Sequence, residues 1–203
     1  MSRITCYHFA TADMRLGYGD GRQIVVGETL SIPAEQTPEC CVRGLHGSVK
    51  IADALDYAMG PMLCRVQIWG DVARQKDKLC GRNRKTLAAV GFTPWLRLYA
   101  RWCALQTISL WPNPPQVVID YLTTGEETLR AAARDASWAA AMAAAMAAAM
   151  DAARAAARAA AMAAAWEHLE KYAALALAGK PCPTKLSTPK RSAMIAAAKK
   201  AKP

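Results

Sequence analysis

The chain has 203 residues and a formal net charge of +10, from 26 Lys and Arg against 16 Asp and Glu. Charge and alanine are both unevenly distributed: residues 180–203 contain seven basic and no acidic residues, and 28 of the 48 residues from 131 to 178 are alanine. These figures exclude one uniform globular domain. They divide the chain into an N-terminal domain over 1–122, an Ala-rich segment over 123–179 and a basic tail over 180–203.

The composition of the chain gives an expectation about membranes and about the cellular compartment. Although 53% of the residues are hydrophobic, alanine inflates this figure, and no run of about 20 strongly apolar residues occurs. We therefore expect no membrane partner. The N-terminus lacks the apolar core of a signal peptide, so the seven cysteines are expected to be reduced thiols in a cytosol.

The N-terminal domain begins with strand patterns. Residues 4–10 and 24–32 are predicted strands, and the Gly-rich turn at 17–21 between them suggests that they form a hairpin. Residues 62–69 alternate apolar and polar side chains, which predicts a half-buried strand.

Helices follow the first strands. Ser48 suits a helix N-cap, and the residues after it predict a short helix that Gly60 ends. A longer helix is predicted over 94–110, because apolar residues recur on one face of it: Trp95, Leu98, Tyr99, Trp102 and Leu105. Strands followed by helices indicate an α+β fold: a small N-terminal α+β domain, then one long Ala-rich helix and a mostly irregular basic tail.

Three residues of the N-terminal domain are candidates for a ligand or anion site. Arg43, His46 and Ser48 precede the predicted helix N-terminus, where backbone N–H groups favour an anion. In the alternative interpretation, His46 only holds a turn by hydrogen bonding.

No catalytic or metal-binding set emerges from the sequence. Pairing a cysteine with His46 or His8 leaves no orienting third group, and no C-x-x-C pair marks a zinc site. No enzyme activity, metal or cofactor is therefore expected.

Three motifs of this domain occur together. The stretch from Cys40 to Ser48 reads C-C-V-R-G-L-H-G-S, and D-A-L-D-Y-A at 53–58 and R-V-Q-I-W-G at 65–70 follow. This combination resembles a family encoded by phages and prophages, with an R-G-L-H-x-S core, a D-A-L-x-Y-A helix, an R-V-x-x-x-G strand and an Ala-rich repeat. The resemblance covers about residues 1–170. It implies a viral origin and a role in the cytoplasm of the infected bacterium. Because the function of the family is unknown, it supplies no activity and no catalytic residues.

The Ala-rich segment predicts one long helix. Thr124-Gly-Glu-Glu127 has the pattern of a capping box, and nothing breaks the helix before Gly179. Every fourth residue is large or charged, which builds a ridge beside shallow alanine grooves. The predicted helix interface consists of Trp138, Met142, Met146, Met150, Met162 and Trp166. The ridge favours self-association or docking to a protein or to the N-terminal domain, and the alternative is a solvated spacer.

Basic residues suggest a polyanion as a further partner. The tail has the composition of a disordered polycation that binds nucleic acid without sequence preference. A second basic cluster lies at 74–85, in a stretch that resembles a loop. The candidate nucleic-acid or polyanion residues are Lys180, Lys185, Lys190, Arg191, Lys199, Lys200, Lys202, Arg82, Arg84 and Lys85.

Together these features predict a non-enzymatic bacteriophage accessory protein in the host bacterial cytoplasm. It acts through an Ala-rich docking helix and a tail that binds nucleic acid or an acidic host partner. One alternative is a structural or scaffold-like component associated with the virion. Another is a small ligand-binding or transferase-like domain centred on His46.

Overall fold

The computed structural model describes residues 2–111, 113–147 and 153–184, without the side chains from 142 to 164. The chain divides into two compact units. The first comprises Met1–Trp95 and Leu169–Pro181, and the second comprises Leu96–His168 and continues from Cys182. These limits differ from the expected boundaries, because both α2 and α5 contribute residues to each unit.

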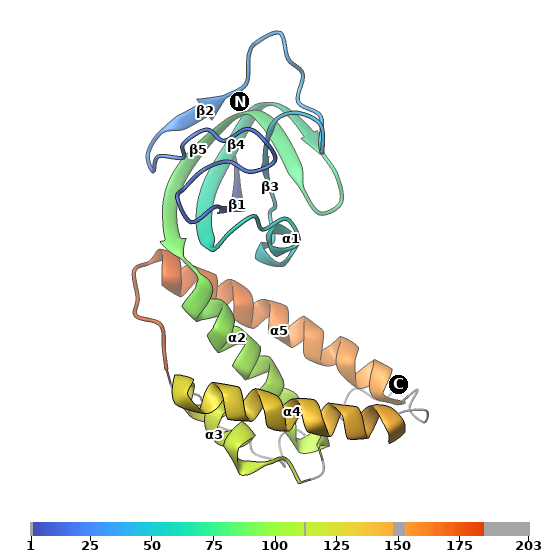
Figure 1. The fold of residues 1–203 in the computed structure, drawn as a ribbon. Coiled ribbons are helices and arrows are strands. Elements are labelled where there is room, and N and C mark those ends of the chain that lie inside the picture. Colours follow the sequence, from blue (N-terminus) through green and yellow to red (C-terminus); the bar gives the residue numbers. More distant parts are fainter. Residues whose placement is uncertain (1, 112, 148–152, 185–203) are drawn as a thin grey trace. The chain divides into compact units, whose positions relative to one another are not determined.

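The described residues combine an antiparallel sheet with α-helices (Figure 1), as the α+β prediction requires. The strands are β1 (Ile4–Ala10), β2 (Thr29–Ser31), β3 (Leu45–Gly47), β4 (Met62–Arg74) and β5 (Leu79–Gly91). The helices are α1 (Ile51–Leu55), α2 (Thr93–Thr107), a 3-10 turn (Ile108–Leu110), α3 (Gln116–Thr124), α4 (Glu127–Ala147) and α5 (Ala153–Leu177). None of the described helices is both long and apolar enough to span a membrane.

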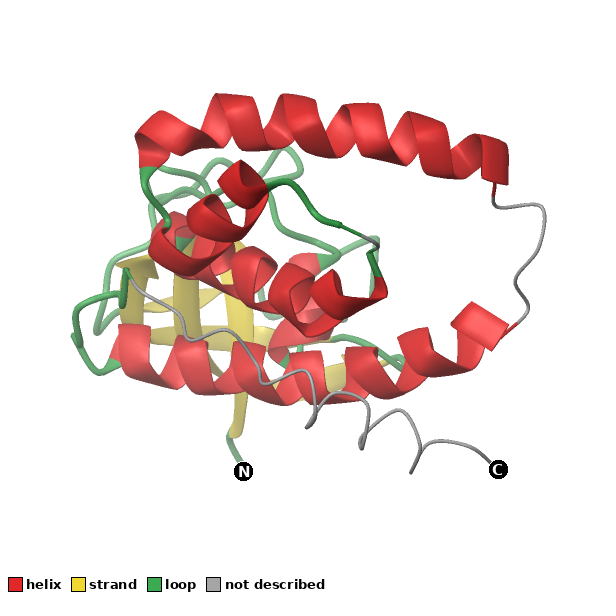
Figure 2. Ribbon diagram, turned by 90° about the horizontal axis from the view of Figure 1, so that it is seen from below, coloured by secondary structure: helices red, strands yellow, loops and turns green. Residues whose placement is uncertain are grey.

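All of the strands belong to the first unit and form one sheet, shown in yellow in Figure 2. The strand order is β1-β4-β5-β2, and β3 also pairs with β5. Tyr7 and Ser48 exchange two backbone hydrogen bonds of 2.8 and 3.0 Å, which join the end of β3 back to β1. The sheet therefore closes on itself around a core that includes Cys6, Val66 and Ile68.

The predicted hairpin between 4–10 and 24–32 is wrong. β1 pairs with β4, and β2 pairs with β5, so the two segments are not neighbours. Only Thr29–Ser31 of the second segment is a strand, because the chain turns at Gly27, which has a φ of 91°. The two long strands β4 and β5 instead provide the central backbone partners of the sheet.

The alternation predicted for 62–69 is confirmed at Cys64, Val66 and Ile68, which are fully buried, but Leu63 on the opposite face is fully buried as well. The interpretation of 74–85 as loop-like is wrong, because β4 and β5 form a hairpin through a tight turn in which Gln75 N–H donates to Lys78 O. Alternating apolar residues on both sides of the turn extend the sheet through this basic stretch.

The short helix after Ser48 is present, but the predicted cap is wrong. Ser48 is buried, and its backbone groups pair with those of Tyr7. The helix α1 begins after Lys50, and the free N–H of Ile51 donates to Glu170 Oε1 at 2.8 Å. A carboxylate from α5 therefore caps α1 in place of the local hydroxyl.

In the second unit, α2 confirms the predicted helix, and its apolar face contributes to a core. Leu105 packs in one cluster with Val118 and Leu122 of α3 and Ala133 of α4. The buried Arg101 donates to the carbonyl of Leu122 at 3.4 Å and to that of Thr184 at 3.1 Å. One guanidinium thus satisfies main-chain carbonyls from two separate segments.

The predicted capping box at 124–127 is wrong. Gly125 is left-handed, with a φ of 69°, and ends α3. Thr124 Oγ1 accepts the N–H of Glu126, while Glu127 forms an ion pair with Arg130 at 2.7 Å instead of reaching back to the cap. The glycine breaks the hydrogen-bond pattern that a capping box requires.

One continuous Ala-rich helix is not confirmed. The structure describes two helices, α4 and α5, and 148–152 lie outside the described residues. Of the predicted interface, Trp138 is 70% exposed on α4, and Trp166 stacks on Tyr99 of α2 with ring centroids 6.5 Å apart. The side chains of Met142, Met146, Met150 and Met162 lie outside the described residues.

The C-terminal part of α5 belongs to the first unit and packs there. Leu169, Tyr172, Ala173 and Ala176 are buried, and the ring of Tyr172 lies 5.9 Å from that of Trp95. This part confirms one of the two packing alternatives for the Ala-rich segment, in which it folds back on the N-terminal domain.

Candidate ligand-binding site

The first unit contains a cavity of about 610 Å³ that is open to solvent on one side. It is lined by β1, β3 and α1, by the loop residues from 16 to 22, by residues from 32 to 44, and by Lys78 and Arg84. This volume falls within the range that small-molecule sites occupy in proteins, about 300–1,000 Å³.

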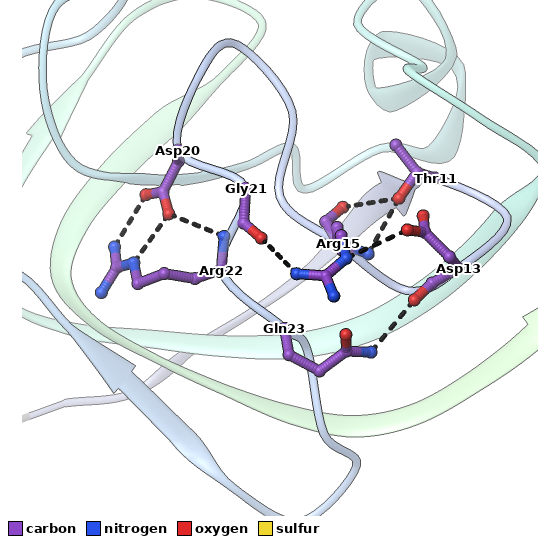
Figure 3. Close-up of polar contacts among 7 residues, drawn as sticks. All are labelled: Thr11, Asp13, Arg15, Asp20, Gly21, Arg22 and Gln23. Carbon is purple, nitrogen blue, oxygen red and sulfur yellow. Dashed lines mark hydrogen bonds and ion pairs between the residues drawn. The ribbon is translucent and has the colours of Figure 1, made fainter.

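Part of the cavity is lined by a loop that includes Asp20 and Arg22. Figure 3 shows the polar contacts that hold this loop. Thr11 Oγ1 accepts the N–H of Arg15 at 2.8 Å, and the Arg15 guanidinium pairs with Asp13. Arg22 holds Asp20 with two parallel bonds, from Nε to Oδ1 at 2.7 Å and from Nη2 to Oδ2 at 2.8 Å. These contacts lower the pKa of the Asp20 carboxyl and fix the loop in one conformation.

Arg84, on β5, is one of the residues that line this site. Its side chain is 1% exposed, and Nη1 donates to the backbone carbonyl of His46 at 2.8 Å. Within the described part of the chain, its Nε and Nη2 have no hydrogen-bond partner. Burial lowers the pKa of the guanidinium to about 10, so Arg84 remains a cation at pH 7.

The three predicted ligand residues come together at this cavity. Arg43, His46 and Ser48 all line it. His46 Nε2 accepts the N–H of Cys41 at 3.2 Å, as the turn-holding interpretation proposed, and burial lowers its pKa, so the imidazole is neutral at pH 7. Arg43 is exposed, whereas the backbone of Ser48 belongs to the sheet closure.

His8 is a site residue that the sequence patterns did not single out for ligand binding. It lies on β1 and lines the cavity. Its Nε2 atom is buried and has no hydrogen-bond partner among the described residues. Burial is also the largest cause that lowers its pKa, followed by the charge of Arg84. The alternation of β1 places His8 on a buried face, but only the strand pairing shows which residues surround it.

The cavity lining is basic. Its charged residues are the four cations Arg22, Arg43, Lys78 and Arg84 and the single anion Asp20. Lys78 also covers the ring of Tyr57, with Nζ 4.1 Å from the ring centroid, and Tyr57 donates a short hydrogen bond to Asp77. Tyr57 and Lys78 are thus held together where they line the cavity.

The candidate polyanion residues on β5 do not lie in a loop. Arg82 forms an ion pair with Asp71 at 2.6 Å, and Arg84 is buried, so neither is a free cation for phosphate binding on the surface. Lys85 is half-buried, and Lys180 is exposed. The remaining tail residues, Lys185, Lys190, Arg191, Lys199, Lys200 and Lys202, lie outside the described residues.

The cysteines do not assemble a metal site. In the part of the chain that the structure describes, no three His, Cys, Asp or Glu side chains are grouped closely enough to hold a metal ion. Cys40 and Cys80 are buried thiols with their Sγ atoms 3.5 Å apart, next to the loop that lines the cavity.

Comparison of the chain with protein-family models, with curated proteins and with solved structures finds no match.

Proposed function

We propose that the first unit is a non-enzymatic ligand-binding domain whose cavity takes a small organic molecule. The observation that carries this proposal is the cavity of about 610 Å³, because apolar walls and a few converging polar groups are what small-molecule sites share. Leu16, Ile32 and Leu45 provide apolar walls, and His46 and Arg84 provide polar groups. Of the functions considered from sequence, this is the ligand-binding alternative centred on His46.

The hydrogen bonds of the two candidate bases, His46 and His8, support binding rather than catalysis. His46 already uses Nε2 to hold the turn at Cys41, and His8, whose Nε2 is buried, has no nucleophile hydrogen-bonded to that atom among the described residues. A nucleophile and its base must lie within hydrogen-bond reach of one another. The proposal therefore requires no reaction.

Native mass spectrometry of the full chain tests this proposal. Val42 and Val49 are both exposed, at 64% and 56%, but only Val42 lines the cavity. We expect a small molecule to remain bound to the wild type and to Val49→Trp, and to be lost from Val42→Trp, since the indole obstructs the cavity. Equal occupancy in all three proteins, or an empty wild type after gentle purification, would contradict the proposal.

A second proposal concerns the Ala-rich segment and the tail. We propose that the chain is a bacteriophage accessory protein of the host cytoplasm, in which the segment 123–179 meets a protein partner or a second copy. The exposure of Trp138 on α4 supports this, because burying an indole in an interface is favourable by about 1.5–3 kcal/mol. The tail would bind nucleic acid or an acidic host partner, and this part rests on composition. The virion-associated role is the alternative.

Two measurements separate these roles. Light scattering of the wild type and Trp138→Ala tests self-association, and we expect the variant to dissociate at lower concentration. Nucleic-acid binding by the full chain and by a truncation after Thr184, at two salt concentrations, tests the tail. Unchanged binding after truncation would remove the tail from the proposal, and the protein's presence in purified particles would favour the virion-associated role.

A further inference from the structure

We infer that the ligand of the first unit carries a carboxylate or phosphate group, and that Arg84 holds this group through Nε–H and Nη2–H. This inference rests on the proposed ligand-binding function and specifies the class of the ligand. It starts from the two guanidinium nitrogens of Arg84 that lack a partner among the described residues.

The geometry of a guanidinium decides which ligand group fits. Nη1 is already used, since it donates to His46 O. The remaining Nε–H and Nη2–H lie on one edge of the planar group and point in parallel, at the spacing of two oxygens of one carboxylate or phosphate. The same protein uses this edge elsewhere, because Arg22 binds both oxygens of Asp20 through its Nε and Nη2.

Among the described residues no acidic side chain is hydrogen-bonded to Arg84, although the negative charge of Asp20 acts to raise its pKa. Asp20 is the only acid that lines the cavity, and both of its oxygens are occupied by Arg22. A buried cation without a counter-ion is costly, and an anion that reaches it is bound more strongly than it would be at the surface. Arg84 thus keeps two donors without a partner among the described residues, for an anion that the chain itself does not supply.

The rest of the lining specifies the body of the ligand. Phe9, Leu16 and Ile32 are buried apolar residues of the same cavity. His8 is neutral and has a free Nε2, so it adds a hydrogen bond without adding charge. Inorganic ions would leave most of the volume unfilled. The ligand is therefore an organic acid or a phosphate ester with an apolar body.

A series of matched probes tests the inference on the full chain: hexanoate, hexyl phosphate and hexanol. We expect hexanoate or hexyl phosphate to raise the melting temperature of the wild type and hexanol to have no effect. The better of the two anions distinguishes a carboxylate ligand from a phosphate ligand. Because the comparison uses only the wild type, it does not depend on any variant folding.

Variants locate the binding group. Arg84→Met keeps an unbranched stem and removes the guanidinium with its charge, and we expect it to weaken anion binding at least ~30-fold. Arg82→Met is the matched control, since Arg82 lies two residues away on β5 and does not line the cavity. Equal weakening by both variants, or binding of hexanol as tight as that of hexanoate, would overturn the inference. A neutral molecule found by native mass spectrometry would also overturn it while leaving the proposed function intact, whereas an empty cavity would remove both.

Discussion

Glu170 of α5 makes two contacts whose removal should destabilise the first unit. Its Oε2 accepts the hydroxyl of Tyr7 at 2.9 Å, and its Oε1 accepts the N–H of Ile51 at 2.8 Å. The two partners lie on β1 and at the start of α1, so one carboxylate connects three elements that are far apart in sequence. The substitution Glu170→Ala removes both contacts.

The magnitude follows from the two bonds. A hydrogen bond to a charged group contributes about 1.5–3 kcal/mol, and both contacts are only partly buried, so we take the low end for each. Glu170→Ala should therefore lower the free energy of unfolding by about 3 kcal/mol. For a chain of this length that corresponds to a fall in melting temperature of roughly 6–12 °C.

Circular dichroism during thermal and urea unfolding measures this change. Glu167→Ala is the matched control, because Glu167 lies one turn earlier on α5 and is exposed. An exposed substitution should change stability by no more than about 0.5 kcal/mol. If Glu170→Ala were as stable as Glu167→Ala, the Glu170 carboxylate would not hold α1 and β1 together.

Three further predictions concern pH, backbone strain and oxidation. Burial, followed by the hydrogen bond to the α5 carboxylate, raises the pKa of Tyr7 to about 12 from 10, so the wild type should lose stability as pH rises from 10 to 12. Tyr7→Phe should lack that component of the loss, and parallel pH profiles would refute this cause. Gly125 and Gly179 share a φ of 69°, but only a Cβ at Gly125 would overlap the side chain of Arg101. Gly125→Ala should therefore lower the free energy of unfolding by at least ~1 kcal/mol more than Gly179→Ala. A mild disulfide oxidant such as oxidised glutathione should take two electrons and two protons from the neighbouring thiols of Cys40 and Cys80, leaving two reduced glutathione molecules and a Cys40–Cys80 disulfide. Peptide mapping should then find that link, and a reduced pair would contradict it.

The features that sequence predicted well are those that local patterns determine. The alternation in β4 and the apolar stripe of α2 each reflect one periodicity, and both are confirmed by burial, as at Cys64, Val66 and Leu98. Strand pairing was not predictable in this way, because a Gly-rich turn between two strands is compatible with several partners. The pairing was decided by β4 and β5, whose 13-residue strands are long enough to take neighbours on both sides.

Helix caps were also poorly predicted, for a related physical reason. Ser48 and Thr124 both have the side chain of a good cap, yet the backbone of Ser48 is used by the sheet and Gly125 follows Thr124 in a left-handed conformation. The actual cap of α1, Glu170, is 119 residues from Ile51. A local rule cannot find a partner that only the tertiary fold supplies.

Some residues of the candidate site were also predictable from local sequence, and Arg84 was not. Arg43, His46 and Ser48 were predictable as a group because they are close in sequence, and all three line the cavity. Arg84 belonged to a basic cluster, and its composition alone favoured a solvated cation. Its burial follows from the pairing of β5 with β4 and β2, where Arg84 lies opposite Ile68 and Leu30, and its guanidinium reaches His46 O.

The burial of Arg84, which local sequence did not predict, bears on the function of the site. A cation on a strand face is expected to remain in water, since burying it without a partner costs several kcal/mol. The fold nevertheless encloses Arg84 while its acidic neighbour Asp20 is paired elsewhere. Positions where local rules fail in this manner concentrate at functional sites, because a binding partner supplies the missing compensation. The same burial that made Arg84 unpredictable from its sequence neighbours is therefore the strongest reason to expect an anionic ligand beside it.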